Sequence, residues 1–547
     1  MDTQRTLLAI IISFLILIGY QYLFVDFEQV PQDVVQTEEN GSQEQKQPPM
    51  IQPETEQVEQ PALPVDGRPA LDINIETELY KAVISERGGA VKSFVLKKYR
   101  ESSAKDSPGK QLIQTDDAVG FPLKFGWGDL FLPDTLYDSS KQQISLVQGA
   151  EKDSLVLGSS GSGLEVERTY VFFKDKYYID MTVKVKNTSS NPLQGAAKVY
   201  QVNLPFQSAS TSASRFLFTG PAAYINDTYH QIKDDEFQEA AKTMHGNMSW
   251  AGYQGTYFTC SVAPLVTENI SFTMKGKEKL VWTTIGSGLD TLKPGEEKAY
   301  SYRIYYGPKK LKLLKEAGDN LAKAVNFGWF DVIAKPTLWL LNLFYKVVHN
   351  YGIAIIMITI LFKAVFWPIT HKGMKSMKNM QKLQPKMVKI KEKYKDDPAQ
   401  MNREMMNLYK TYKVNPLGGC LPMLLQIPVF FALYKVLLQS IELRHAPFML
   451  WITDLSAPDR LMVGVDIPIL GGIPVLTLLM GASMFVQQKL TPTTADPAQQ
   501  RIMLILPVIF TFMFLNFASG LVLYWFVNNL LAILQQQMIN RSSGTAA

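Results

Sequence analysis

Residues Gly352 to Pro368 read GIAIIMITILFKAVFWP, an apolar run of nearly membrane-spanning length that is interrupted by one cation, Lys363. A charge in hydrocarbon costs roughly 2.5 to 3.5 kcal/mol on insertion scales, so such a side chain normally faces a hydrated cavity or the interior of a helix bundle. The simpler alternative is that Lys363 extends to the headgroups, because Thr370 lies only about 10 Å further along the helix. This segment alone leaves both interpretations open.

The composition places the chain among membrane proteins. Its 547 residues are 46% hydrophobic, and the apolar residues are concentrated in blocks instead of being spread evenly. Cys260 and Cys420 fall in segments with different predicted surroundings, so neither a disulfide nor a metal site is expected. The sequence has no G-x-x-x-x-G-K-[ST] motif and no other sign of a cofactor, so a nucleotide-driven process is not expected.

The N-terminal segment predicts a membrane anchor followed by a tether. Residues 1–25 form an apolar helix, and bulky side chains from Tyr20 to Phe24 stand where a signal peptidase needs small ones, so we expect an uncleaved signal anchor. Residues 26–68 are rich in Gln, Glu and Pro and predict a disordered linker.

Residues 69–328 predict a large all-β domain that ends in a helix. From Tyr177 to Asn187, apolar and polar residues alternate with the period of a half-buried strand. Similar runs occur at Leu71 to Ile75, Val166 to Phe173, Phe258 to Val262 and Tyr300 to Tyr306. Gly, Ser and Asn clusters between such runs favour an antiparallel sandwich. After Pro308 one helix is expected, ended by Gly328 and burying Leu314, Ala317, Leu321, Ala324 and Val325.

The next segment, residues 329–350, is apolar and aromatic but contains Pro336 and two lysines. We interpret it as an amphipathic helix lying at the membrane interface; the alternative is a buried helix of the sandwich.

Hydropathy then predicts five further spans, for a total of six. The predicted spans are residues 351–370, 417–438, 467–488, 501–517 and 519–537, separated by loops at 371–416, 439–466 and 489–500 and followed by a tail at 538–547. Between His371 and Pro416 there are twelve Lys and Arg against four Asp and Glu, a net charge of 12 − 4 = +8, so this loop is expected in the cytoplasm. The loop 439–466 is acidic, and both termini are then cytoplasmic.

The basic loop itself predicts a helical hairpin. Lys372 to Lys395 has helical composition with a bend expected at Pro385, and Asp397-Pro398 is typical of the start of a second helix. The cations that we assign to partner recruitment are Lys375, Lys378, Lys382, Lys386, Lys389 and Arg403. The hairpin's methionines suit an adaptable binding surface, and a self-packed hairpin with a solvated charged face is equally consistent with the pattern.

Polar side chains in the predicted spans accompany Lys363. They are Thr359, Gln426, Ser483, Thr511, Asn516, Ser519, Tyr524 and Asn528. Each alone is more often a link between helices, but together with a cation they favour a hydrated groove. Because no Asp or Glu was found within the spans, a proton relay or cation pathway is disfavoured.

Several motifs in residues 350–540 resemble those of the YidC/Oxa1/Alb3 membrane protein insertases. They are Asn415 to Pro422 (NPLGGCLP), Leu425 to Pro428 (LQIP), Trp367 to Thr370 (WPIT), Leu455 to Asp459 (LSAPD) and Ser519 to Trp525 (SGLVLYW). The long extracytoplasmic sandwich after an uncleaved first span resembles the Gram-negative YidC branch in particular. That resemblance implies a five-helix conserved core, a galactose-mutarotase-like supersandwich and a cytoplasmic helical hairpin in the bacterial inner membrane.

The resemblance also implies a substrate groove. Lys363 stands where the family generally has arginine, which keeps the charge and loses the planar fork. Thr359 and Tyr524 match groove and substrate-contact positions, and Trp525 stands where a tyrosine is common. The candidate groove set is Lys363, Thr359, Gln426, Thr511, Asn516, Ser519, Tyr524 and Trp525. Asn516 and Ala518 depart from the family's usual Trp and Pro before Ser-Gly.

We therefore expect a membrane protein insertase and chaperone without enzymatic activity, cofactor or metal. The expected partners are nascent membrane proteins, Sec translocon components, ribosome and signal-recognition components and membrane lipids, with no direct nucleic-acid specificity. The alternatives are a secondary transporter with a periplasmic ligand-binding domain, for which no internal duplication is visible, and a sugar enzyme in the sandwich. His230 and His245, the histidines of the sandwich, come with no recognisable catalytic setting.

Overall fold

The structure is a computed structural model that describes residues 68–206, 217–412, 414, 421–464, 471–491 and 497–542. The predicted signal anchor and nearly all of the predicted linker lie outside these residues, as does Cys420. The segments Pro69–Thr494 and Ile502–Ala547 form one compact unit, which holds both a β domain and the helices that follow it.

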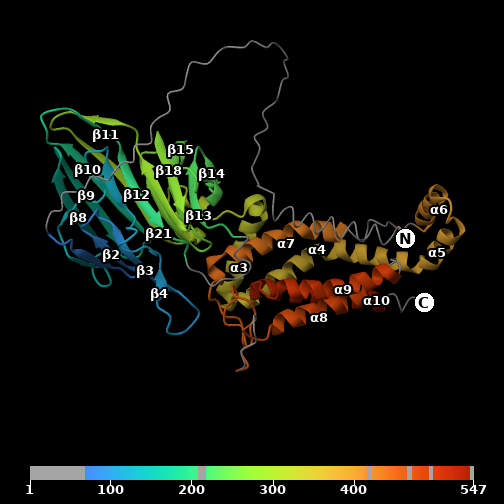
Figure 1. Cartoon of the computed structure of the whole chain (residues 1–547). Coiled ribbons are helices and arrows are strands. Elements are labelled where there is room, and N and C mark those ends of the chain that lie inside the picture. Colours follow the sequence, from blue (N-terminus) through green and yellow to red (C-terminus); the bar gives the residue numbers. More distant parts are fainter. Residues whose placement is uncertain are drawn as a thin grey trace, which may run out of the picture. The chain divides into compact units, whose positions relative to one another are not determined.

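The β domain consists of four sheets (Figure 1). The nine-stranded sheet has the order β14 (Thr228–Gln231), β13 (Gly220–Ile225), β16 (Met248–Gln254), β17 (Phe258–Pro264), β21 (Glu297–Pro308), β10 (Tyr178–Asn187), β9 (Leu164–Phe173), β8 (Lys152–Gly161), β6 (Asp138–Ser139). One five-stranded sheet has the order β4 (Gly109–Gln111), β3 (Val91–Arg100), β2 (Tyr80–Ser85), β1 (Asp72–Glu76), β7 (Gln143–Ser145). The other has the order β15 (Lys242–Gly246), β18 (Ile270–Lys277), β19 (Leu280–Gly286), β12 (Ala197–Asn203), β5 (Lys124–Trp127), and β11 (Leu193–Gly195) pairs with β20 (Asp290–Leu292).

The alternating runs of the sequence form strands as predicted. In β10, Ile179, Met181, Val183 and Val185 are buried, and the residues between them are half-buried or exposed. All five predicted strands are present, as β1, β9, β10, β17 and β21, and the last four of these are neighbours in the nine-stranded sheet. The prediction of a β sandwich is therefore confirmed, with the exception that β1 pairs with β7 in parallel.

The prediction of a single helix after Pro308 is wrong. The chain forms α2 (Leu311–Ala317), breaks, and resumes as one 3₁₀ turn, η3 (Leu321–Ala324). The break arises because Gly318, Asp319 and Asn320 all have positive φ (80°, 49° and 57°), which no helix can accommodate. The predicted apolar positions on both sides of the break are nevertheless buried against the sandwich.

The remainder of the unit is helical (Figure 1). Its helices are α3 (Asp331–Val348), α4 (Tyr351–Lys382), α5 (Gln384–Lys393), α6 (Pro398–Thr411), α7 (Leu421–Gln439), α8 (Val475–Leu490), α9 (Pro497–Phe514) and α10 (Ser519–Ser542), with short 3₁₀ turns η2 (Asp234–Glu236) in the β domain, η4 (Gly328–Phe330) before α3 and η6 (Ile441–Leu443) after α7. Together with the β domain this matches the predicted fold class.

The helix that carries Lys363 continues beyond the predicted span. α4 is 32 residues long and runs through Pro368 into the basic segment as far as Lys382. Pro385 lies in the first turn of α5, so the chain breaks at Leu383 where we predicted only a bend. The second hairpin helix begins as predicted, because the side chain of Asp397 accepts hydrogen bonds from the backbone N–H groups of Ala399 (3.1 Å) and Gln400 (3.0 Å).

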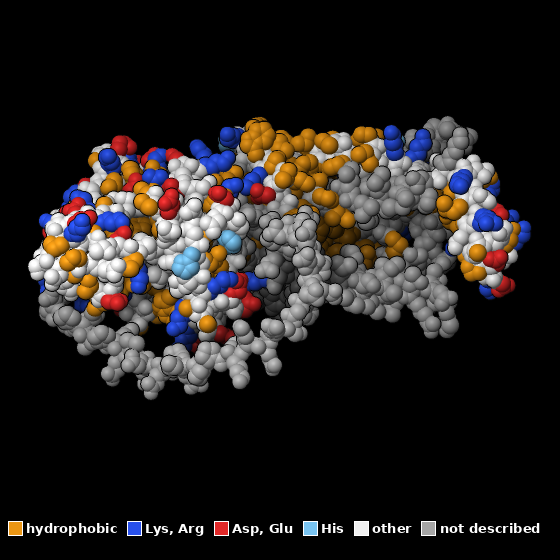
Figure 2. Space-filling view, turned by 90° about the horizontal axis from the view of Figure 1, so that it is seen from above, with side chains coloured by type: hydrophobic (Ala, Val, Ile, Leu, Met, Phe, Trp, Pro, Cys, Tyr) orange, Lys and Arg blue, Asp and Glu red, His pale blue; other side chains and the backbone are white. Residues whose placement is uncertain are grey.

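Among the described residues, α4 is the one helix both long and apolar enough to cross a membrane, and shorter apolar helices lie at Gln426–Gln439, Val475–Leu490 and Met503–Phe514. Figure 2 shows hydrophobic side chains gathered over the helical region, whereas charged side chains lie over the β domain and the α5–α6 hairpin. The most exposed of the apolar side chains on α9 is Phe512, at 70%. Such a surface is expected of helices that contact lipid.

Helix α3 has two apolar faces. Ala334, Thr337, Leu338 and Leu341 are buried, and the helix packs on α4 and α7. On the other side, Val332, Trp339, Leu343 and Val347 are exposed. A helix of the sandwich core would not expose this second face, so the arrangement agrees with an interfacial position, which stays a prediction.

A buried cation, Arg168, connects separate segments of the β domain by hydrogen bonds, and its replacement tests the fold. Arg168 is 0% exposed and donates to the carbonyls of Gly88 and Leu123, both at 2.7 Å, and to the hydroxyl of Tyr170. We predict that Arg168→Leu lowers the free energy of unfolding by roughly 1 to 3 kcal/mol for each acceptor left without a donor. Denaturation of the full-length chain in detergent, followed by intrinsic fluorescence, measures this loss.

The exposed Lys184 supplies the control for this experiment, because Lys184→Leu on β10 should change the stability by less than about 0.5 kcal/mol. Equal stabilities for Arg168→Leu and the wild-type chain would show that the hydrogen bonds from Arg168 to these carbonyls do not stabilise the fold.

Candidate functional site

A narrow crevice surrounds Lys363 between three helices, α4, α7 and α10. It is lined by Thr359, Phe362, Lys363, Phe366 and Thr370 of α4, Gln426 and Val429 of α7, and Tyr524 and Asn528 of α10. Its volume of about 10 Å³ is close to the minimum for a single water molecule. The side chains on α4 share one face because each of them lies three or four residues from another member of the set.

The ammonium group of Lys363 lies inside the bundle and has an amide as its partner. Its Nζ donates to Oδ1 of Asn528 over 3.5 Å, and Nε2 of Gln426 donates to the same oxygen over 3.3 Å. Asn528 is in the first half of α10, well away from either end of that helix. The amine therefore points across the bundle and does not extend along α4 towards the headgroups.

The wall of the crevice is polar without being acidic. Thr359 is 2% exposed and donates to the carbonyl of Ile355 over 2.6 Å, and Tyr524 is 4% exposed. None of the described residues that line the crevice is Asp or Glu. The charge of Lys363 is thus compensated by an amide dipole, which leaves it able to attract an anionic group.

Helix α10 is fixed to its neighbours by a series of polar contacts. Asn529 donates to Ser483 of α8 over 3.0 Å, and Gln535 donates to Thr370 of α4 over 2.9 Å. At the end of α10, Nζ of Lys378 donates to the carbonyls of Ile539 and Asn540, both over 3.3 Å. A lysine in this position satisfies C-terminal carbonyls and interacts favourably with the helix dipole.

The three walls of the crevice are not equally well packed. α10 packs closely along α4 and α8, whereas α7 packs mainly on α3 and contacts α4 and α10 at few positions. The side of the crevice formed by Gln426 and Val429 is therefore the one whose displacement breaks the fewest contacts.

The structure brings four of the eight predicted groove residues together, namely Lys363, Thr359, Gln426 and Tyr524. Thr511, Asn516, Ser519 and Trp525 are not in the crevice. Oγ1 of Thr511 donates to the carbonyl of Pro507 over 2.7 Å, and Asn516 accepts from Arg460 over 2.8 Å.

The other two misplaced residues are on α10 itself. Ser519 begins the helix and donates to the carbonyl of Asp454 over 2.9 Å. Trp525 contacts the rings of Phe430, Phe510 and Phe514 at centroid distances of 5.3, 6.0 and 5.2 Å. It follows Tyr524 directly and so points about 100° away from it on the helix.

Five residues of the crevice were missing from the predicted set: the polar residues Asn528 and Thr370 and the apolar residues Phe362, Phe366 and Val429. Asn528 follows Tyr524 by four residues and Thr370 follows Lys363 by seven, so helical spacing from the predicted residues identifies both. Sequence reasoning also overlooked Lys435, a second cation in a predicted span, which lies four residues before the end of α7.

The structure exposes most of the cations that we assigned to recruitment, but one of them binds another helix. Lys375, Lys382, Lys386, Lys389 and Arg403 are exposed on the α4 extension, α5 and α6. Lys378 binds α10, as described above, and Lys386 donates to the hydroxyl of Tyr412. Some of the hairpin's methionines are internal. Met380 and Met387 form a buried cluster with Leu383, and Met377 and Met405 pack against this cluster.

Metal chemistry has no visible site in this part of the chain. The described residues contain no group of three or more His, Cys, Asp and Glu side chains that could hold a metal ion. Cys260 is buried in β17 and is reduced.

The fold and the crevice define a class of protein: a helical bundle with exposed apolar side chains and an internal cation, preceded in the chain by a β domain. Residues 343–545 match the family model described as 60Kd inner membrane protein, and residues 72–340 match that of the YidC periplasmic domain. The chain is 41% identical to the membrane protein insertase YidC of Geotalea daltonii and 42% identical to that of Pelobacter propionicus, in both cases over 98% of this chain and 99% of the relative.

The chain belongs to the YidC family of membrane protein insertases, and it is an insertase of the inner membrane that acts on membrane proteins. The predicted family is thus confirmed, and the relatives do not favour the secondary transporter. A solved structure, that of an active YidC insertase with its first transmembrane domain resolved, is 19% identical and covers 85% of this chain and 92% of its own, with a TM-score of 0.35. At that score the likeness supports no structural inference.

The shared acceptor in the crevice gives a test of the site. We predict that Asn528→Leu reduces membrane protein insertion, because Lys363 and Gln426 both lose their acceptor, at a cost of roughly 1 to 3 kcal/mol for each group left unpaired. Complementation of an insertase-depletion strain measures the effect.

Asn529 supplies a matched control, because it is the neighbouring asparagine on α10 and binds Ser483 of α8 outside the crevice. Asn529→Leu should reduce thermal stability and leave more insertion activity than Asn528→Leu at equal protein level. Indistinguishable activities would mean that Asn528 acts only by holding helices together.

Proposed function

We propose that the crevice around Lys363 is where the polar segment of a client membrane protein enters the insertase. The observation that carries the proposal is the ammonium of Lys363, held inside the helices by the amide of Asn528, with no acidic residue among the described residues of the crevice. A buried cation without a counter-ion attracts an acidic group of a client.

Entry requires the crevice to widen, because its present volume of about 10 Å³ has no room for a peptide. We propose that α7 moves away from α4 and α10, since it contacts them at few positions. Water that follows the separation solvates Lys363 and shortens the distance that a polar segment crosses in hydrocarbon. The Lys378 contact and the other polar contacts keep the opposite wall in place.

The hydrophobic part of the client then moves into lipid. The apolar side chains exposed on α4, α7 and α9 provide the surface along which a client helix leaves, among them Val365 (60% exposed), Phe431 (40%) and Ile509 (57%). Transfer of an apolar helix into the bilayer is favourable, and it removes the client from the polar crevice.

The arrangement in the membrane is part of the same proposal. It has six spans with both termini in the cytoplasm, the domain boundaries given by the sequence, and no enzymatic activity. The basic hairpin supports this orientation, since five of its six assigned cations are exposed. The proposed partners are Sec translocon components, ribosome and signal-recognition components and anionic lipids.

The charge at position 363 is the most direct test of the proposal. We predict that Lys363→Arg is tolerated and that Lys363→Ala and Lys363→Glu impair insertion of clients with acidic translocated segments, because only a cation attracts such a segment into a partly desolvated site. Complementation of a depletion strain and insertion of one client with its acidic residues present or neutralised measure the effect.

Lys435→Ala is the control, because this lysine is also in a predicted span but does not line the crevice. If all three replacements at position 363 inserted acidic and neutral clients as well as the wild-type chain does, the charge would have no role in client entry.

The hairpin gives a separate prediction. Replacing Lys382, Lys389 and Arg403 by glutamine should weaken binding of translating ribosomes to the chain in nanodiscs, with a smaller salt dependence, because each exposed cation contributes to electrostatic attraction. Replacing Lys184, Lys186 and Lys275 of the β domain removes the same charge and should not weaken binding. Equal ribosome binding by both triple variants would contradict recruitment by the hairpin.

A further inference from the structure

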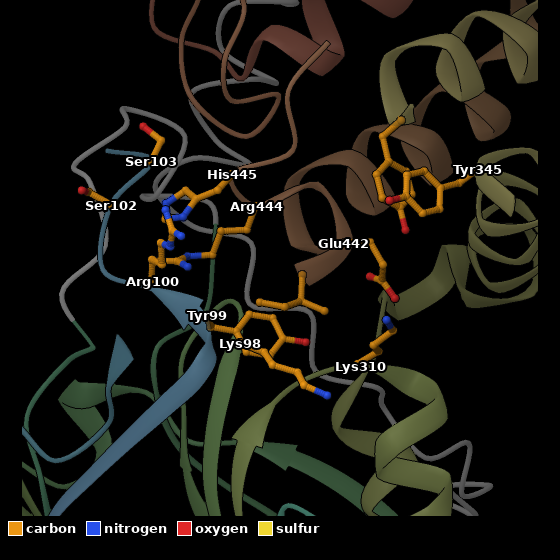
Figure 3. A pocket seen from close by; sticks show the side chains of 12 residues that line it. Lys98, Tyr99, Arg100, Ser102, Ser103, Lys310, Tyr345, Glu442, Arg444 and His445 are labelled. Carbon is orange, nitrogen blue, oxygen red and sulfur yellow. The ribbon is translucent and has the colours of Figure 1, made fainter. Parts of the chain in front are cut away.

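A second and much larger cavity, of about 430 Å³, lies where the β domain meets the helices (Figure 3). Its lining comes from the end of β3 and the loop after it, from Lys310 before α2, from the last turn of α3, from the first residue of α4 and from the segment that follows α7. Neither the insertase mechanism nor the predicted groove residues make use of it.

One half of this cavity is rich in hydrogen-bond donors. Figure 3 shows Arg100, Arg444 and His445 gathered together, with Ser103 above them and Ser102 to one side. Arg444 is held in place, because it donates to the carbonyl of Glu101 over 3.1 Å and its guanidinium carbon lies 5.3 Å from the centroid of the Phe258 ring. A guanidinium held in this way is prepared for an anion before the anion arrives.

The other half of the cavity offers acceptors and aromatic rings. The carboxylate of Glu442 and the amine of Lys310 point toward one another in Figure 3. Tyr345 and Tyr351 stack with their ring centroids 3.9 Å apart. A carboxylate and stacked phenol rings suit a hydroxyl or ammonium group of a ligand.

The charges of the lining do not cancel. Four side chains are cationic, Lys98, Arg100, Lys310 and Arg444, and one is a carboxylate, Glu442. Burial, and next the charge of Arg444, lowers the pKa of His445, so this side chain is a neutral donor at pH 7. The excess positive charge favours an anionic ligand.

The cavity lies at the N-terminal end of α4. Tyr351 is the first residue of α4, the described helix that is long enough to span a bilayer, and the basic hairpin follows the opposite end of that helix. A ligand in the cavity is therefore within reach of lipid headgroups at the end of the bundle that carries the β domain.

We propose that this cavity binds a phosphate ester of a small polar alcohol or amino alcohol, the chemistry of a phospholipid headgroup and of its soluble counterpart. The phosphate lies between Arg100 and Arg444, whose planar groups match its oxygens, and receives further hydrogen bonds from the serine hydroxyls. The alcohol or amine end points toward Glu442 and the stacked tyrosines. The site would bind its ligand whether or not Lys363 has the function proposed above.

Calorimetric titration of the purified full-length chain in detergent tests this site with two probes, dihexanoyl phosphatidylglycerol and sn-glycerol 3-phosphate. We expect Arg100→Gln to weaken binding about tenfold, the loss of one charge-assisted contact. Because Arg100 also donates to the carbonyl of Lys105 in its own loop, Lys98→Gln provides a second variant with the same expected direction. Lys275→Gln combined with Lys277→Gln removes two exposed charges outside the cavity and should leave binding unchanged.

Binding of the lipid alone supports a headgroup as the source of the phosphate ester, and equal binding of both probes supports a soluble ester. The proposal is overturned if neither probe binds, or if Arg100→Gln and Lys98→Gln bind both probes as the wild-type chain does. It is also overturned if hexaglutamate displaces the bound probe with equal affinity, because the cavity would then be a site for acidic peptides.

Discussion

The ammonium group of Lys363, inside an apolar helix bundle, makes the strongest demand on this structure. Lys363 has no nearby carboxylate among the described residues of its crevice, and it donates to the amide oxygen of Asn528, which also accepts from Gln426. A charge in such surroundings is stable only if polar groups or water remain close to it. The polar side chains of α4, α7 and α10 meet at this point, and the arrangement of these helices follows from that requirement.

The helices that form the walls of the crevice are not equally well packed against their neighbours. Hydrogen bonds of Asn529, Gln535 and Lys378 connect α10 to α8 and α4, whereas α7 packs mainly on α3. In the mechanism that we propose, the site opens on the α7 side, and its nearly closed state keeps the cation from lipid when no client is present. Lys378 joins the basic extension of α4 to the end of α10, the helix that carries Asn528 of the crevice.

Local patterns in the sequence predicted individual helices and strands, but they could not predict which elements that are distant in the chain pack against one another. The alternation in β10 and the Asp397 cap depend on neighbouring residues, and both are present. β9 and β10 pair as a local hairpin, whereas the pairing of β10 with β21 joins residues more than a hundred positions apart in the chain. The ring contacts of Trp525 with Phe430, Phe510 and Phe514, and the cavity beside Arg444, depend likewise on how whole elements pack, which no local pattern encodes.

Photo-crosslinking tests the central claim most directly. A benzophenone amino acid is placed at position 426, in the wall of the crevice, or at position 365, where Val365 is 60% exposed on the outside of α4. During insertion of a client with an acidic translocated segment, we expect that segment to crosslink from position 426 and not from position 365. Crosslinks of the polar segment from position 365 alone would contradict the account.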